Sequence, residues 1–231
     1  MSAPGRARTL VTLDGPAGSG KSTTAREVAR RLGYRYLDSG ALYRALTHAL
    51  LEAGIPVGRW PSLEPSDLDA LGVRVEPGND RVRVRQGARL LDAELRRDEV
   101  TARVSDLARV PAVRGWLLDA QRDAGREGRL VADGRDMGSV VFPEAGVKVF
   151  LQADPRERAR RRLRDKGVDH PDETRLDQEE ALLRERDAKD EGREHAPLRV
   201  PEGALVLDTT HLTFQEQVER IVRRARDVAG G

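Results

Sequence analysis

Residues 9–23 read TLVTLDGPAGSGKST, and this stretch decides the fold. Its first five residues are β-branched or apolar and predict a buried strand over 9–13. From 15 to 22 the chain matches the pattern G-x-x-x-x-G-K-[ST] at every fixed position. Glycines there let successive backbone N–H groups face one anion, the lysine adds positive charge, and the serine hydroxyl can ligate Mg²⁺. Since a helical pattern follows through Leu32, we expect a loop that binds the phosphates of a nucleoside triphosphate.

The rest of the chain alternates strand-like and helix-like patterns joined by short connections. This alternation is typical of an α/β fold in which a parallel sheet is covered by helices on both faces. Further strands are expected at 34–37, 130–133, 147–151 and 204–208. Helices are expected at 20–32, 38–51, 96–110 and 111–125, from 155, at 174–191 and from 214.

Between 60 and 95 the character of the sequence changes. Prolines interrupt the segment, and residues 73–91, VRVEPGNDRVRVRQGARLL, alternate apolar and polar side chains around two turns. That pattern predicts a small antiparallel sheet with one solvated face. We therefore divide the chain into a core (1–58, 97–154 and 193–231), an inserted subdomain (59–96) and a helical segment (155–192).

The composition is highly charged but balanced. The chain of 231 residues carries 41 Lys and Arg against 39 Asp and Glu, a net charge of +2 with a pI near 9.2. Arginines and acids are interleaved, which favours an ion-paired surface over a nucleic-acid-binding tail. The absence of cysteine excludes disulfides and thiolate metal sites. Because no apolar run approaches the ~20 residues of a membrane span, and residues 1–10 lack an apolar signal stretch, we expect a cytoplasmic protein.

Three further stretches could bind a second anion. A guanine-reading [NT]-K-x-D element is absent at all four lysines, which argues against a GTPase. Residues 38–44 (DSGALYR) and 133–138 (DGRDMG) each follow a predicted strand, and ligands bind at the carboxyl ends of parallel strands. The helix at 174–191 changes from an apolar stripe to Arg and Asp. Each stretch has a purely structural alternative. Residues 38–44 could be a capped helix with a surface arginine, 133–138 a simple turn, and 174–191 a surface ion-pair ladder.

The quoted stretches, with 37–44 (LDSGALYR), 132–143 (ADGRDMGSVVFP) and 185–198 (ERDAKDEGREHAPL), resemble bacterial cytidylate kinases over nearly the whole chain. The resemblance implies that the chain moves the γ-phosphoryl group of ATP onto CMP or dCMP with Mg²⁺, as a monomer that binds neither nucleic acid nor membrane. It also implies that 59–96 binds the monophosphate and that 155–192 contains a closing lid.

The resemblance assigns roles to individual residues. The residues that would hold ATP are Gly15, Pro16, Ala17, Gly18, Ser19, Gly20, Lys21, Ser22 and Thr23. Ser22 would also ligate the metal ion. Ser105, Arg114 and Asp136 would read cytosine and Asp190 the sugar, while Ser39, Tyr43, Arg44, Arg135, Arg186 and Arg193 would complete the acceptor site. The residues that would act in catalysis are Lys21, Arg135, Arg186, Arg158 and Arg162. The lid stretch, which departs most from the family pattern, contains Arg158, Arg161 and Arg162.

The chemistry of the residues agrees with this reading. A nucleoside monophosphate is largely dianionic near pH 7, so its transfer needs charge neutralisation more than a general base. Arginine suits that task because its planar fork pairs two phosphate oxygens. The alternatives are a kinase of the same fold for UMP, AMP or a shikimate-like acid, an RNA-binding protein that uses the arginines of 156–164, and a general ATPase.

Overall fold

A computed structural model describes residues 9–230 of the chain; residues 1–8 and Gly231 lie outside the described residues. The expectation that residues 1–10 lack a signal stretch therefore lies largely outside the described residues. So do the outer ends of the segments 1–58 and 193–231. The core is a five-stranded sheet in the order β2-β6-β1-β7-β8, with every neighbouring pair parallel. The strands are β1 (Leu10–Asp14), β2 (Arg35–Asp38), β6 (Leu130–Gly134), β7 (Val147–Gln152) and β8 (Leu205–Asp208).

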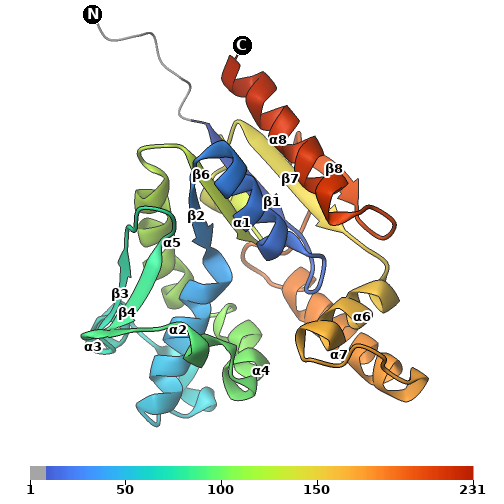
Figure 1. Ribbon diagram of the computed structural model, residues 1–231. Coiled ribbons are helices and arrows are strands. Elements are labelled where there is room, and N and C mark those ends of the chain that lie inside the picture. The colour runs from blue at the N-terminus through green and yellow to red at the C-terminus, as the bar shows by residue number, and fades with distance from the viewer. Residues whose placement is uncertain (1–8, 231) are drawn as a thin grey trace, which may run out of the picture.

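Helices cover both faces of this sheet, as predicted (Figure 1). Along β6 the side chains alternate, so that Val131 joins one apolar cluster while Leu130 and Ala132 join another. Val28 and Ile221 bring α1 (Lys21–Leu32) and α8 (Phe214–Gly230) onto the first face. On the second face α2 (Ser39–Glu52) packs against β6, and α4 (Asp98–Leu107) and α5 (Pro111–Gly125) extend the same apolar cluster.

The predicted small antiparallel sheet is confirmed, with β3 (Val73–Glu76), β4 (Arg83–Gln86) and β5 (Arg89–Leu90) in that order. It follows η1 (Val57–Ser62) and α3 (Pro65–Ala70) and precedes η2 (Ala93–Arg96). Trp60 of η1 and Val84 of β4 are buried in the same cluster as Leu46 of α2, so the inserted segment shares the core of the main sheet. Backbone hydrogen bonds join Tyr36 to Asp80 and Val82, which covers the free edge of β2.

Three elements complete the fold. A turn of π-helix, η3 (Met137–Val141), follows β6, at a place where the sequence analysis expected no helix. Helices α6 (Pro155–Asp165) and α7 (Glu173–Glu191) pack against each other around a third, small apolar cluster. Among the described residues, no helix has the length and apolar character that crossing a bilayer requires.

Candidate active site

The carboxyl ends of β1, β2 and β6 open into one cavity of about 490 Å³. This is the edge where the sequence placed its candidate residues. Predicted site residues that line the cavity are Ala17, Gly18, Gly20, Lys21, Ser22, Thr23, Ser39, Tyr43, Arg44, Ser105, Arg135, Asp136, Arg162, Arg186, Asp190 and Arg193. Gly15, Pro16, Ser19, Arg114 and Arg158 are not part of its lining.

The phosphate loop leads directly into the first helix. Gly20 precedes α1 in the left-handed conformation (φ 84°), which a glycine adopts without strain. The backbone N–H groups at the start of α1 are therefore turned toward the loop, where they can bind an anion. The Lys21 side chain is buried, and its Nζ donates to the Pro16 carbonyl oxygen at 3.0 Å.

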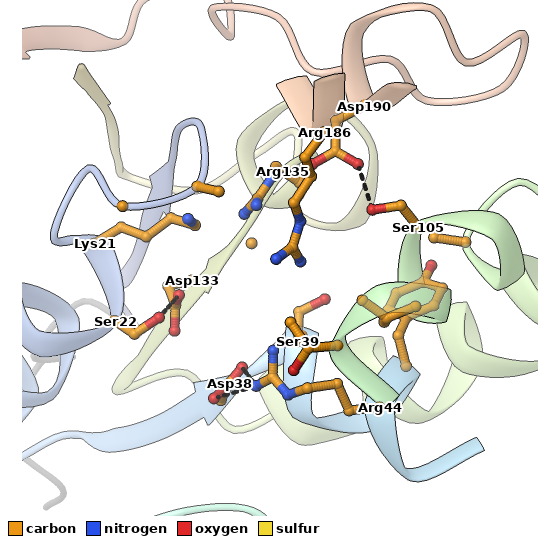
Figure 2. A pocket seen from close by; sticks show the side chains of 18 of the residues that line it. Lys21, Ser22, Asp38, Ser39, Arg44, Ser105, Asp133, Arg135, Arg186 and Asp190 are labelled. Carbon is orange, nitrogen blue, oxygen red and sulfur yellow. Dashed lines mark hydrogen bonds and ion pairs between the residues drawn. The ribbon is translucent and has the colours of Figure 1, made fainter. Parts of the chain in front are cut away.

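Positive charges converge from opposite sides of the cavity. Figure 2 shows the cationic ends of Lys21, Arg135 and Arg186 pointing into the same space. Burial, together with the charge of Arg135, lowers the pKa of Lys21 well below its ordinary value. The same two causes lower the pKa of Arg186 to about 10. The cavity therefore disfavours its own cations, a penalty that a bound polyanion would relieve.

Asp190 of α7 joins several of these groups. Its carboxylate accepts hydrogen bonds from Arg135 Nε at 2.7 Å, from Arg193 and from Ser105 Oγ at 3.3 Å. Burial by itself would raise the pKa of Asp190, but Arg135, Arg193 and Arg186 outweigh it and lower the pKa to about 2. Asp190 is thus an ionised carboxylate that orients two arginines beside the cavity.

Asp136 forms a buried ion pair with Arg114. Arg114 comes from α5, and the same guanidinium donates to Tyr43 Oη at 3.2 Å. Burial and the charge of Asp136 raise the pKa of Tyr43 to about 12, so this hydroxyl keeps its proton at neutral pH. Arg114 therefore acts from behind the cavity wall, through two side chains that line it.

The start of α2 holds Ser39 and Arg44 in place. Asp38 is the N-cap of α2: it accepts from Ala41 N at 2.8 Å, and it also pairs with Arg44 at 3.0 Å. Gln121, which the sequence analysis did not single out, donates to Ser39 Oγ at 2.9 Å and is 1% exposed. With its oxygen already accepting, Ser39 can donate its own proton to a ligand.

Asp133 was part of a predicted motif but received no role. It is the last residue but one of β6 and lies beside the phosphate loop, where Ser22 Oγ donates to its Oδ2 at 2.6 Å (Figure 2). Burial, with the charge of Asp38 adding to it, raises the pKa of Asp133 to about 6. A carboxylate that ends a strand next to the phosphate loop is the sequence signal that could have identified it.

Asp14 was also missed, although it directly precedes the loop. It is fully buried, and its two carboxylate oxygens accept from Met137 N and Gly138 N, each at 2.7 Å. These bonds join the end of β1 to the turn that carries Arg135 and Asp136. Burial raises the pKa of Asp14 to about 7.

The three arginines of the predicted lid separate in space. Only Arg162 lines the cavity. Arg161 donates to the Thr209 carbonyl oxygen at 2.6 Å, beyond the end of β8. Arg158 is 5% exposed and its guanidinium faces Asp187 and backbone carbonyls, so the direct catalytic role predicted for it has no support from its position.

Comparisons with known proteins agree with this geometry. The family model described as Cytidylate kinase matches residues 11–227. A protein named cytidylate kinase from Exiguobacterium sp. is 43% identical over 94% of this chain and 96% of its own length, and one from Salinibacter ruber has the same identity and coverages. A solved structure of an uncharacterized protein from Eubacterium ventriosum is 11% identical, with a TM-score of 0.50 over 95% of this chain and 99% of that one, which shows the fold alone. The chain therefore belongs to the cytidylate kinase family.

Proposed function

We propose that this chain transfers the γ-phosphoryl group of ATP directly and in line to CMP or dCMP, giving ADP and CDP or dCDP. The observation that carries the proposal is the convergence of Lys21, Arg135 and Arg186 between the phosphate loop and the acceptor side of one cavity. Two anions repel each other as they approach, and preorganised cations in a site of low dielectric lower that barrier.

The donor side suits ATP bound with Mg²⁺. Ser22 and Asp133 place a hydroxyl and a carboxylate together at 2.6 Å beside the loop, and Mg²⁺ prefers such oxygen ligands. Within residues 9–230 no group of three or more His, Cys, Asp or Glu could hold a metal, which fits an ion held mainly by phosphates and water. When bound, Mg²⁺ would neutralise charge on the transferring phosphates. Ser22 and Asp133 would orient it.

The acceptor side suits a cytosine nucleotide. Cytosine presents an amino donor where uracil presents a carbonyl oxygen, and ionised Asp136 can only accept. Arg114 holds that carboxylate in place through the buried pair. We assign the acceptor phosphate to Ser39 and Arg44 and the sugar hydroxyls to Asp190, because all three side chains line the cavity.

Two residues of the segment 155–192 support a role for this segment in closing the cavity. Arg162 and Lys166 line the cavity from this side, while Asp98 of α4 lines it from the other. Movement of the two sides toward each other would exclude water from the transferring group and suppress ATP hydrolysis. We likewise propose that 59–96 binds the monophosphate and that 155–192 acts as a lid. We also propose that the protein is a cytoplasmic monomer without nucleic-acid or membrane partners.

The test is an ADP-release assay with CMP, dCMP, UMP and AMP measured side by side. We expect turnover with CMP and dCMP that exceeds turnover with UMP and AMP and requires Mg²⁺. Lys21→Met should abolish transfer to every acceptor, because it removes the buried charge at the phosphates. ATP turnover that is indifferent to CMP would indicate a general ATPase, and a preference for UMP or AMP would reassign the acceptor.

A further inference from the structure

The backbone of Ala17, near the tip of the phosphate loop, is held by two charged side chains from outside the loop. Its N–H donates to Asp187 Oδ1 at 3.3 Å, and its carbonyl oxygen accepts from Arg158 Nη1 at 3.1 Å. Arg158 Nη1 and Asp187 Oδ2 also form an ion pair of 2.5 Å. The N–H and the carbonyl oxygen of Ala17 are thus both hydrogen-bonded by one ion pair, Arg158 with Asp187. The same pair joins α6 to α7.

Packing reinforces this contact. The Ala17 side chain belongs to the small apolar cluster that α6 and α7 form, together with Ala159, Leu163 and Leu183. At Gly18, an added Cβ would lie 3.1 Å from both the Cβ and the carbonyl oxygen of Arg158. The loop after β1 therefore rests directly on the two helices, as Figure 1 shows.

The same helix α7 supplies the acceptor side. Arg186 directly precedes Asp187 in sequence, and Asp190 follows it by one helical turn; both line the cavity, whereas Asp187 faces the loop. A displacement of the Ala17 peptide must therefore move Asp187 or break its bonds. If the helix moves with Asp187, the guanidinium of Arg186 and the carboxylate of Asp190 move too.

Stability alone does not explain a buried charge pair in this place. Arg158 is 5% exposed and Asp187 8% exposed, so both groups lose hydration. Replacing such a pair with apolar side chains of similar size is often neutral or stabilising. The pair does, however, fix two directions of one peptide at once, which apolar side chains cannot do.

We propose that Arg158 and Asp187 are positioning residues that couple the two halves of the site: they lock the phosphate loop at Ala17 to the helix that carries Arg186 and Asp190. The proposal rests on the proposed function, since it takes the loop as the ATP site and α7 as part of the acceptor site. Phosphate bound at the loop then favours the α7 position that binds the acceptor. By linkage, the acceptor strengthens ATP binding by the same factor.

The decisive variant is Arg158→Met combined with Asp187→Leu, because it removes both charges together. We expect it to fold with a melting temperature close to that of the wild type, whereas Asp187→Leu alone leaves an unpaired buried cation and should melt much lower. The matched control is Glu185→Gln with Lys189→Met. It removes an exposed ion pair of 2.9 Å from the same helix.

Calorimetry would measure the affinity for CMP with and without a non-hydrolysable ATP analogue, and the affinity for the analogue alone. In the wild type and the control we expect the analogue to tighten CMP binding about fivefold or more. In the double variant we expect this coupling to disappear, and the affinity for the analogue to fall about tenfold, while CMP alone binds as before. Undiminished coupling in the folded double variant, or none in the wild type, would overturn the proposal.

Arg158→Lys serves if the double variant does not fold. It keeps a cation beside Asp187, but a lysine amine cannot reproduce the planar fork that reaches Asp187 and the carbonyl oxygens of Ala17 and Ala153. We expect this variant to be stable and its coupling to be reduced; full coupling would refute the proposal. Failure of the proposed function would show differently, as wild-type protein that binds the ATP analogue but does not turn over ATP with CMP.

Discussion

The hydroxyl of Tyr36 donates a hydrogen bond of 2.6 Å to Oδ1 of Asp133. Tyr36 lies on β2, the strand beside β6, so the pairing of two strands fixes the carboxylate whose other oxygen accepts from Ser22. Burial and the charge of Asp133 raise the pKa of Tyr36 well above its ordinary value, so this hydroxyl remains a donor. Tyr36 thus orients the carboxylate that we assign to Mg²⁺.

Tyr36→Phe should therefore increase the free Mg²⁺ concentration needed for half-maximal rate by about tenfold, since groups that orient a metal ligand commonly contribute that much. The rate at fixed ATP, followed against free Mg²⁺, measures this shift. Tyr34→Phe is the control, because Tyr34 contacts Arg129 rather than the site. An unchanged Mg²⁺ dependence in Tyr36→Phe would remove Tyr36 from this role.

Asp136→Asn should reduce the preference for CMP over UMP. An amide can donate to the carbonyl oxygen of uracil, whereas the carboxylate can only repel it. We expect the ratio of kcat/KM for CMP to that for UMP to fall about tenfold or more. Tyr43→Phe keeps the pair of Asp136 with Arg114 and should leave the ratio nearly unchanged. If the ratio in Asp136→Asn equals that of the wild type, another group reads the base.

Much of this arrangement follows from local sequence patterns. The strand, glycine loop and helix at 9–32 are determined by residues close together in the sequence. The alternation of strands and helices along the chain predicts a parallel sheet. Since the carboxyl ends of parallel strands meet, polar residues after β2 and β6 had to lie near the loop. That is why the sequence alone predicts Ser39, Arg44 and Arg135 at the cavity that they line.

What the sequence could not provide are contacts between distant residues. Ser39 and Gln121 are 82 positions apart, and Ala17 and Asp187 are 170 apart. Gln121 has the pattern of an ordinary helix residue, and Asp187 that of an acid in a charged helix. Their roles depend on how α5 and α7 pack, a tertiary property that local propensity does not encode.

Gly15→Ala should destabilise the phosphate loop by more than the backbone strain of a positive φ alone. The φ of Gly15 is 153°, and an added Cβ would lie 2.2 Å from the carbonyl oxygen of Leu151 on the neighbouring strand β7. We expect the free energy of unfolding to fall by more than about 2 kcal/mol and ATP binding to weaken. Denaturant unfolding and calorimetry measure the two effects.

Gly54→Ala is the matched control for this change. Its φ is +66°, and an added Cβ would meet nothing within 4 Å. The cost should therefore be that of backbone strain alone, on the order of 1 kcal/mol, with ATP binding unaffected. Equal losses of stability in the two variants would show that β7 does not press on the loop as described.

Asp14 makes the stability of the protein depend on pH. Its pKa is about 7 in the folded chain, because burial raises it above the ordinary value of 3.8. Between these values the folded state keeps a proton that the unfolded state has lost, so this group's contribution is complete below pH 4 and is lost as the pH rises through 7. Over the whole range the loss is on the order of 4 kcal/mol.

Asp14→Asn removes that titration. We expect the free energy of unfolding of the wild type, relative to Asp14→Asn, to fall by about 2 kcal/mol or more between pH 5 and pH 8. Urea unfolding at several pH values measures this difference. The exposed Asp119, changed to Asn, should show no such trend. A wild type that instead gains stability over Asp14→Asn as the pH rises would mean that the bonds from Met137 and Gly138 hold an ionised carboxylate, and that their stabilisation exceeds the cost of burial.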